Sequence, residues 1–176
     1  MRIRPVDPAD AAEIAAIYAH HVLHGTASYE TVPPDAAEIG QRMARVLSHS
    51  WPWLVAEDEA GALLGYAYAT QFRDRAAYRY VCEDSIYIRD DARGQGVGKA
   101  LLGALIAACE EAGFRQMVAV IGGAEPASAA LHARLGFAEA GRLSGIGRKQ
   151  GRWLDTLYMQ RSLGPGSTAA PEVEPV

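Results

Sequence analysis

The sequence predicts an α/β fold in which a mixed sheet of about seven strands is covered by four helices. Two observations carry this prediction. Strand-like and helix-like stretches alternate along the chain in the order β-α-α-β-β-β-α-β-α-β-β. The apolar run at residues 117–121 lacks the polar alternation of a half-exposed strand, as expected for a strand that is buried on both faces.

The N-terminal half is predicted to begin with a strand and to continue with two helices and a hairpin. Asp7-Pro8 supplies a cap followed by proline at the first helical position, and this helix runs to about residue 22. Asp35, three residues before Glu38, caps a second helix that runs toward Ser48. A turn at Gly61 joins two strands. The expected strands are 3–6, 53–56, 63–69 and 80–88, and the imperfect alternation of the last one indicates a bulge.

The C-terminal half is predicted to contain two helices and three strands. Apolar residues at helical spacing predict a long helix from Gly96 to Ala112, which Gly113 ends. A last helix covers 126–135 and stops at Gly136, and residues 144–151 resemble a turn. The expected strands are 117–121, 137–143 and 153–161.

Length and composition indicate one folded unit with a tail. The chain has 176 residues, of which 49% are hydrophobic and 22% charged, so it is long enough for one well-buried core. We expect a single domain over residues 1–163. Residues 164–176 are rich in proline and glycine and have no apolar periodicity, so we expect a disordered tail. The formal net charge of -4 argues against a nucleic-acid partner.

Membrane, disulfide and metal chemistry are not predicted. No apolar run approaches the roughly 18 to 20 residues that cross a bilayer, and the first residues lack an apolar signal segment, so we expect a cytoplasmic protein without a membrane partner. Cys82 and Cys109 lie in apolar strings that are typical of small core residues. His20, His21 and His24 have helical spacing but no evident acidic or cysteine partner nearby, so no metal site is expected.

A glycine-rich segment between a strand and the long helix is the strongest functional signal. Residues 93–99 read Arg-Gly-Gln-Gly-Val-Gly-Lys, and three glycines let the backbone come close to a ligand. Exposed N–H groups at a helix N-terminus favour an anion, above all a pyrophosphate. The segment therefore predicts a pyrophosphate site.

Two familiar phosphate motifs do not fit this segment. A Walker A loop would need glycine and a hydroxyl residue where the chain has Arg93 and Ala100. A G-x-G-x-x-G fingerprint would need glycine where the chain has Lys99 or Leu101. Neither nucleotide-binding motif is therefore predicted.

The segment resembles the R/Q-x-x-G-x-G/A pyrophosphate loop of the GNAT superfamily of N-acetyltransferases, which bind acetyl-CoA and acetylate amines. Residues 128–137 resemble that family's second motif, a short helix that lies along the pantetheine and ends in Gly-Phe. The resemblance covers about residues 1–163, and residues 141–155 are similar to the phosphinothricin acetyltransferase branch. That branch acts on the α-amine of phosphinothricin, methionine sulfoximine and related amino acids.

The resemblance implies the GNAT fold, with acetyl-CoA as co-substrate. Backbone N–H groups of the strand before the loop, which splays from its neighbour in this family, would donate to the thioester carbonyl and the pantetheine amides. Many relatives carry Asn a few residues before Ser128, where this chain has Glu125-Pro126, so Ser128 is the nearest replacement. The expected acetyl-CoA contacts are Ile86, Tyr87, Ile88, Arg93, Gly94, Gln95, Gly96, Val97, Gly98, Lys99 and Ser128.

Acetyl transfer needs a deprotonated amine, stabilisation of the thioester oxygen and a proton for the departing thiolate. Glu83 corresponds to the glutamate proposed as general base in the phosphinothricin branch, and it would act through water or on an amine whose pKa the pocket lowers. Asp84 points to the opposite face of a regular strand and is the weaker candidate. His132 stands where the wider family has the tyrosine credited with protonating the thiolate. Neither cysteine has a basic partner, which predicts direct transfer.

Two segments are predicted to bind the amine substrate. Residues 72–80 combine three arginines with aromatic residues, a composition suited to a carboxylate and a second anion such as a phosphinate. We expect Arg75, Tyr78 and Arg79 to contact it. Residues 27–30 resemble the substrate-side loop of the branch, which adds Tyr29 and Glu30.

The sequence thus predicts an acetyl-CoA-dependent N-acetyltransferase of a small amino-acid analogue. Two alternatives stay open. One is an acetyltransferase of the same fold that acts on a protein N-terminus or a polyamine, and the other is a catalytically silent acetyl-CoA-binding sensor. The resemblance also implies a homodimer, to which Trp153-Leu154 would contribute.

Overall fold

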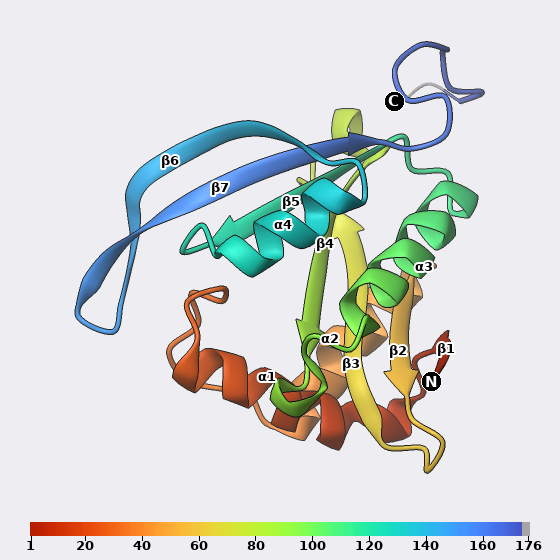
Figure 1. Ribbon diagram of the computed structural model, residues 1–176. Helices are drawn as coiled ribbons and strands as arrows, with labels where there is room; N and C mark the ends of the chain where they lie inside the picture. The colour runs from red at the N-terminus through yellow and green to blue at the C-terminus, as the bar shows by residue number, and fades with distance from the viewer. Residues whose placement is uncertain (174–176) are drawn as a thin grey trace.

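A seven-stranded sheet with helices on both sides forms the body of the protein in a computed structural model, which describes residues 1–173 (Figure 1). The strand order is β1-β2-β3-β4-β5-β7-β6. β4 and β5 run parallel, whereas the other neighbouring strands are antiparallel. The strands are β1 (Arg2–Pro5), β2 (Trp53–Glu57), β3 (Leu63–Gln71), β4 (Val81–Ile88), β5 (Gln116–Gly122), β6 (Ala138–Lys149) and β7 (Arg152–Ser162).

The helices lie where the sequence predicts them. α3 (Val97–Glu111) and α4 (Pro126–Arg134) cover one side of the sheet, and α1 (Ala11–His24) and α2 (Ala36–Ser48) cover the other (Figure 1). Asp35 caps α2 by accepting a hydrogen bond of 2.8 Å from the Glu38 N–H, as predicted. Asp7 instead caps a short 3-10 turn, so α1 begins only at Ala11. Within residues 1–173, no helix has the length and apolar character needed to cross a membrane.

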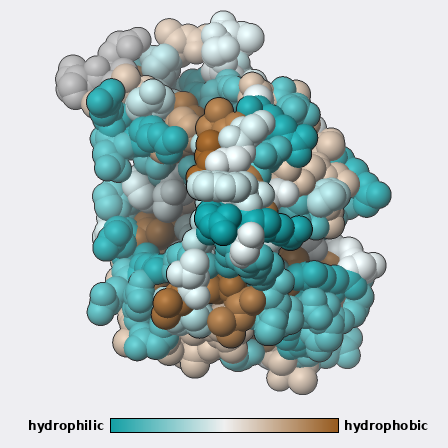
Figure 2. All heavy atoms as spheres, turned by 90° about the vertical axis from the view of Figure 1, so that its left-hand side faces the viewer, coloured by the Kyte–Doolittle hydropathy of each residue, from teal (hydrophilic) through white to brown (hydrophobic). Residues whose placement is uncertain are grey.

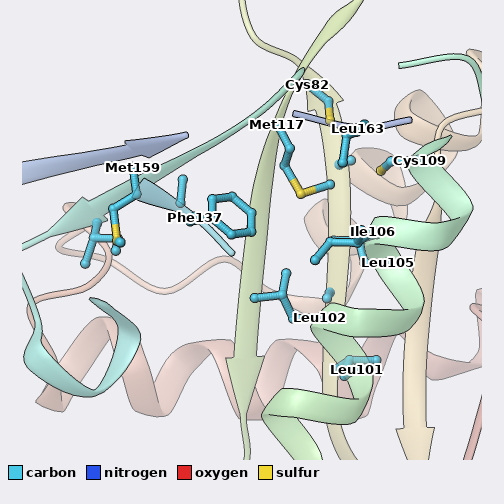
Figure 3. Close-up of a cluster of buried hydrophobic side chains, with 14 of the residues drawn as sticks. Cys82, Leu101, Leu102, Leu105, Ile106, Cys109, Met117, Phe137, Met159 and Leu163 are labelled. Atoms are coloured by element: carbon cyan, nitrogen blue, oxygen red, sulfur yellow. The ribbon is translucent and has the colours of Figure 1, made fainter. Parts of the chain in front are cut away.

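Two hydrophobic clusters hold these layers together. α3 packs on the sheet through residues such as Leu101, Leu105 and Met117, all 0% exposed (Figure 3). Cys82 and Cys109 belong to this cluster as buried free thiols, as predicted. Each fully buried Leu contributes about 1.5–3 kcal/mol relative to an exposed one. The packing therefore fixes the start of α3 against β4. On the other face, α1, α2 and the sheet bury a second cluster that includes Ile14, Met43 and Tyr66.

The central strands separate at mid-length. β4 keeps an unbroken register with β3 from Cys82 to Ile88, so the predicted bulge in this strand is wrong. Its pairing with β5 ends at Asp84 and Ala119, and residues 85–88 have no strand neighbour on that side. The alternation of β4 is imperfect because its second half borders this opening instead of a continuous sheet.

The last two strands form a long arm that extends beyond the helices (Figure 1). The turn predicted at residues 144–151 is shorter in the structure, because β6 continues to Lys149 with a register shift between Leu143 and Gly147. Only Gln150 and Gly151 make the turn, with φ of 51° and 77°. Two left-handed residues are typical of the tightest hairpins. Most of the predicted turn therefore belongs to an irregular part of β6.

The predicted tail begins as a series of turns. The Gly166 N–H donates to Leu163 O over 2.9 Å, and the Thr168 N–H donates to Pro165 O over 3.1 Å. Gly166 lies against Ser162 and Gln116, and the Tyr80 hydroxyl donates to the carbonyl of Val173. Residues 174–176 lie outside the described part of the chain. The mobility of the tail stays a prediction.

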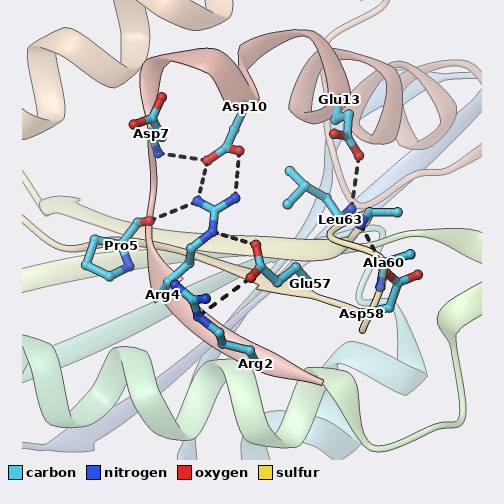
Figure 4. A network of polar contacts seen from close by, with 11 residues as sticks. Arg2, Arg4, Pro5, Asp7, Asp10, Glu13, Glu57, Asp58, Ala60 and Leu63 are labelled. Atoms are coloured by element: carbon cyan, nitrogen blue, oxygen red, sulfur yellow. Dashed lines mark hydrogen bonds and ion pairs between the residues drawn. The ribbon is translucent and has the colours of Figure 1, made fainter.

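An ion-pair network joins the N-terminal strand to the start of α1 (Figure 4). Arg4 binds both carboxylate oxygens of Asp10, at 2.8 and 2.9 Å, and its Nε donates to Glu57 at 2.6 Å. The side chain of Asp10 is 9% exposed and also accepts from the Asp7 N–H. Bidentate pairing of this kind is among the stronger polar contacts in proteins.

We predict that Asp10→Asn lowers the free energy of unfolding by about 1.5–3 kcal/mol at pH 7, because it removes charge-assisted hydrogen bonds. The hydrogen bonds from Arg4 lower the pKa of Asp10, so this stabilisation is present above the unfolded carboxyl pKa of about 3.9 and is lost as the pH falls through the lower folded value. Urea unfolding at pH 7 and at acid pH measures it. The difference between wild type and variant should shrink in acid, while Asp74→Asn, at an exposed position, has little effect at either pH.

Candidate active site

A cavity of about 410 Å³ lies where β4 and β5 separate. Both strands line it, together with the loop between α1 and α2 and with the inner face of α4. The structure therefore brings these four segments of the chain to one place. The predicted site residues among its lining are Tyr29, Glu30, Glu83, Ile86, Tyr87, Ser128 and His132.

The glycine-rich loop follows β4 directly and opens α3. Gly94 and Gly96 have φ of 75° and 83°, values that L side chains rarely adopt, and Gly96 occupies the N-cap position without a side-chain cap. The N–H groups of Val97, Gly98 and Lys99 precede the first complete helical turn and have no intrahelical acceptor. These donors and the positive end of the helix dipole lie in the segment where the sequence predicts an anion site, and their geometry suits an anion.

The loop is anchored on both sides. Val97 is buried in the core, and a Cβ at Gly98 would stand 3.3 Å from Leu131 of α4, so the helix start packs closely against the second motif. Arg93 lies 3.3 Å from Asp90, and Gln95 donates to the carbonyl of Asp91 over 2.8 Å. These contacts fix the loop against the body of the protein.

Glu83 lies on the α1 and α2 face of β4 and lines the cavity. Its side chain is 31% exposed, and Arg73 Nη1 lies 4.0 Å from its carboxylate. Burial raises the pKa of Glu83, which the Arg73 charge partly opposes. A half-buried carboxylate with a raised pKa is a stronger base than one in water, which suits proton abstraction.

His132 is almost fully buried on the opposite face of the cavity. Its Nε2 lies 3.0 Å from Asp84 Oδ2, and its Nδ1 lies 2.7 Å from the carbonyl oxygen of Ser128. Asp84 does point away from the Glu83 face, as predicted. Burial lowers the pKa of His132, but the hydrogen bond and charge of Asp84 outweigh it, so the pKa is raised overall.

Glu125 has a structural task. Its carboxylate accepts a hydrogen bond of 2.7 Å from the Ser128 N–H and so caps α4. Ser128 itself lines the cavity, and its Oγ lies 3.4 Å from His132 Nδ1. The residue in the place of the relatives' Asn thus positions α4, and the second motif with it.

Glu30 lies at the cavity but is already paired. Arg42 binds both of its carboxylate oxygens, at 2.7 and 3.2 Å, and the Tyr18 hydroxyl donates to it over 3.0 Å. Burial opposes the charge of Glu30, yet Arg42 and Tyr18 lower its pKa. The side chain therefore stays ionised and neutralised by Arg42. It shapes the wall of the cavity and has little capacity left for a substrate ammonium group.

Tyr29 joins the α1–α2 loop to the β6–β7 arm. Its hydroxyl lies 2.8 Å from Thr156 Oγ1 and 2.9 Å from Asp155 O, and it accepts from the Gly123 N–H over 3.3 Å. Lys149 adds a second link, since its buried Nζ donates to Ser28 O over 2.7 Å. Burial lowers the pKa of Lys149. These links hold the α1–α2 loop, one wall of the cavity, against the arm.

We predict that Gly147→Ala raises the KM for the amine that the sequence analysis expects as substrate, because the new Cβ would lie 2.5 Å from the Tyr29 ring. The ring is held by three hydrogen bonds, so it cannot move without disturbing the cavity wall. Steady-state kinetics with saturating acetyl-CoA measure the effect. Gly141→Ala is the matched control on the same strand, because a Cβ there meets nothing within 4 Å. Equal KM values in the two variants would contradict the assignment of Tyr29.

The three residues chosen in the segment 72–80 lie outside the cavity. Arg75, Tyr78 and Arg79 are exposed, and Tyr78 packs edge-on against Phe72 at 5.9 Å. Arg73, which sequence reasoning did not select, is the arginine of this segment that comes within 4.0 Å of Glu83. Which arginine of this segment comes close to Glu83 depends on how the loop folds.

The histidines of α1 do not form a metal cluster. The His21 ring lies 2.9 Å from the carbonyl oxygen of Ile88 and so ties α1 to the end of β4. His20 lies 3.6 Å from Asp90. Among residues 1–173, no group of three or more His, Cys, Asp or Glu side chains is arranged to hold a metal ion.

Comparison with known proteins identifies the family that shares this arrangement. The model of the acetyltransferase (GNAT) domain matches residues 3–158. A phosphinothricin N-acetyltransferase of Alcaligenes faecalis is 54% identical over 171 residues, which cover 97% of this chain and 86% of that protein. An L-methionine sulfoximine/L-methionine sulfone acetyltransferase of Pseudomonas paraeruginosa is 41% identical over 167 residues, covering 95% and 97% of the two chains.

A solved structure agrees over the whole fold. The crystal structure of a GNAT superfamily phosphinothricin acetyltransferase from Sinorhizobium meliloti in complex with AcCoA has a TM-score of 0.95 and 50% identity. The matched region covers 97% of this chain and 92% of the Sinorhizobium meliloti chain. The predicted fold class and family are confirmed. With its glycine-rich loop beside the separated strands and a family match over most of its length, this chain belongs to the GNAT family of acetyltransferases.

Proposed function

We propose that this protein transfers the acetyl group of acetyl-CoA to the α-amine of a small amino-acid analogue such as phosphinothricin, methionine sulfoximine or methionine sulfone. The observation that carries the proposal is the position of the cavity, which opens between β4 and β5 directly before the pyrophosphate loop. The names and high identity of the relatives support this substrate class. Acetyl-CoA is the co-substrate, as the solved relative with bound AcCoA supports.

The proposed chemistry divides the site into two sides. The free N–H groups of residues 94–99 bind the diphosphate, and the open edge of β4 at residues 86–88 receives the pantetheine arm and the thioester. Backbone N–H groups of Tyr87 and Ile88 stabilise the oxygen that gains charge when the amine attacks. Tyr29 and the α1–α2 loop enclose the amine from the other side.

Glu83 removes the proton of the attacking amine, directly or through one water molecule. The amine nitrogen forms a bond to the thioester carbon, the carbon–sulfur bond breaks, and sulfur takes the bonding electrons. The cavity lowers the amine pKa by limiting hydration of the ammonium group, while burial makes Glu83 more basic than an exposed carboxylate. Arg73, close to Glu83, supplies the positive charge for an anionic group of the substrate.

Transfer is direct. Cys82 and Cys109 are both 0% exposed, and burial in apolar surroundings disfavours a reactive thiolate. The proposal therefore requires ternary-complex kinetics, in which both substrates are bound before any product leaves. Ping-pong kinetics with an acetylated Cys82 would contradict it.

A substrate panel tests the function. Phosphinothricin, methionine sulfoximine, methionine sulfone, spermidine and N-terminal peptides are each supplied with acetyl-CoA, and the free thiol of CoA is measured against time. The proposal expects turnover with the three amino-acid analogues and much lower kcat/KM for the others. Preference for spermidine or a peptide would identify the first alternative. Thermal stabilisation by acetyl-CoA without transfer to any amine would identify a sensor.

We further propose a cytoplasmic homodimer. Leu143, Ile146 and Trp153 are 46%, 53% and 65% exposed on the β6–β7 arm, an unusual exposure for large apolar side chains. Figure 2 faces the side of the molecule on which the arm extends, and hydrophobic groups interrupt the hydrophilic surface there. Light scattering of wild type and Trp153→Arg tests the dimer, since the variant should be monomeric. The requirement for acetyl-CoA and the two free thiols support a cytoplasmic location.

A further inference from the structure

We propose that Asp84 is a positioning residue that holds His132 in its doubly protonated form beside the cavity, ready to protonate the departing CoA thiolate. The inference rests on the proposed acetyl transfer and deepens it. It assigns a role to the neighbour of Glu83 on β4, which the chemistry described so far does not use.

The hydrogen bonds around the ring define its protons. The carbonyl oxygen of Ser128 can only accept, so Nδ1, 2.7 Å away, carries a hydrogen. An ionised Asp84 can also only accept, so Nε2, 3.0 Å away, carries the second. The two side chains are 2% and 1% exposed, so water competes little with the hydrogen bond between them. The geometry therefore fits an imidazolium paired with a carboxylate.

Asp84 is the charged group that acts on the ring. The α4 backbone contributes the Ser128 carbonyl, which accepts from the ring. The Phe137 ring packs edge-on against the His132 ring, with 5.0 Å between the ring centroids. β5 lines this part of the cavity with residues 119–122, none of which titrates. Glu125 is engaged in the cap of α4, and Glu83 points to the opposite face of β4. Removing the Asp84 charge should therefore change the protonation of His132 with little compensation.

The pair can supply one proton in each turnover. When the carbon–sulfur bond breaks, sulfur takes the bonding electrons and the Nε2 proton of His132. The ring becomes neutral, and its Nδ1–H still donates to the carbonyl oxygen of Ser128. The amine proton leaves through Glu83 to solvent, so the total number of protons is conserved. A neutral Nε2 facing a carboxylate is unfavourable, which returns a solvent proton to the ring before the next turnover. Asp84 Oδ1 is buried without a hydrogen-bond partner among the described residues, so the carboxylate keeps an acceptor free for that proton.

Asp84→Asn is the decisive variant because it keeps the shape of the side chain and removes its charge. The Asn amide can donate to the Nε2 of a neutral ring, which stabilises the wrong protonation state. We expect kcat at pH 8 to fall about 10- to 100-fold, with the KM for acetyl-CoA within about twofold of wild type. The alkaline limb of kcat should move to lower pH by about one unit or more. The loss should be small at pH 6 and should grow with pH.

Nitrogen-15 NMR of the His132 ring, without substrates, reads the same property directly. The expected result at pH 7 is a doubly protonated ring in the wild type and a neutral ring with hydrogen on Nδ1 in Asp84→Asn. Glu139→Gln, an exposed charge removal outside the site, should change neither the ring nor kcat.

Two results would overturn the inference. One is a neutral His132 ring in an active wild-type enzyme, and the other is a loss of kcat in Asp84→Asn that is equal at every pH, as a purely structural defect would give. Both leave the proposed function intact. A wild type that acetylates no amine of the panel would instead contradict the proposed function. His132 would then have no thiolate to protonate.

Discussion

Replacing Glu83 with glutamine is expected to lower kcat about 100- to 10,000-fold, the usual contribution of a general base. Glutamine keeps the volume of the side chain and its position on β4 but cannot accept the amine proton. Acetyl-CoA binding should be nearly unchanged, because the carboxylate lies on the face of β4 that we assign to the amine. Release of the CoA thiol under saturating conditions gives kcat, and calorimetric titration with CoA gives the affinity.

The pH profile adds a second test of Glu83. A base must be deprotonated to work, so the wild-type rate rises as the pH passes upward through the Glu83 pKa. Burial raises that pKa, which moves the acid limb to higher pH than an exposed carboxylate would give. Glu83→Gln should lack this limb, whereas the exposed control Glu111→Gln should keep it. Turnover that survives the substitution would remove the assigned role.

Gly96→Val is expected to weaken CoA binding about 10- to 100-fold, because β-branched residues rarely adopt left-handed backbone conformations and such strain costs about 1–3 kcal/mol. The φ of Gly96 is 83°, although a Cβ would meet nothing within 4 Å. The effect therefore arises from the backbone: the loop must change conformation, and its N–H groups then point away from the diphosphate.

Gly103→Ala is the matched control for Gly96. It lies within α3, has ordinary helical φ and has open space for a Cβ, so it should keep CoA affinity and gain about 0.5–1 kcal/mol of stability. Calorimetry with CoA compares the two variants, and thermal unfolding checks that both are folded. Wild-type affinity in Gly96→Val would contradict the loop as the diphosphate site.

Local sequence patterns were sufficient to predict most of the fold. Caps such as Asp35, the apolar stripe of α3 and the run at 117–121 predicted elements that the structure confirms. The strand at residues 80–88 was predicted, but the bulge in it is wrong, because the imperfect alternation arises from the loss of β5 as a neighbour after Asp84. Residues 144–149 were predicted as part of a turn, but pairing with β7 on both sides of an irregularity at 144–146 makes them part of β6.

The site could be predicted only in part, for the same reason. Glu83, Ser128 and His132 were selected because they stand at fixed positions around recognisable motifs, and the structure places all three at the cavity. The Asp84 partner of His132 is 48 residues away, and the link from Lys149 to Ser28 spans 121 residues, so no local pattern predicts either contact. Charge alone could not tell Arg73 from its neighbours, since the segment 72–80 is exposed over most of its length.

The central claim is that the main-chain N–H groups of residues 94–99 bind the diphosphate beside the open edge of β4. Amide NMR of labelled protein during titration with CoA, and separately with pantetheine, tests it most directly. We predict that CoA shifts the amide signals of residues 94–99 and of 86–88, and that pantetheine, which has no diphosphate, leaves the loop signals unchanged. Loop signals that do not respond to saturating CoA would contradict the claim.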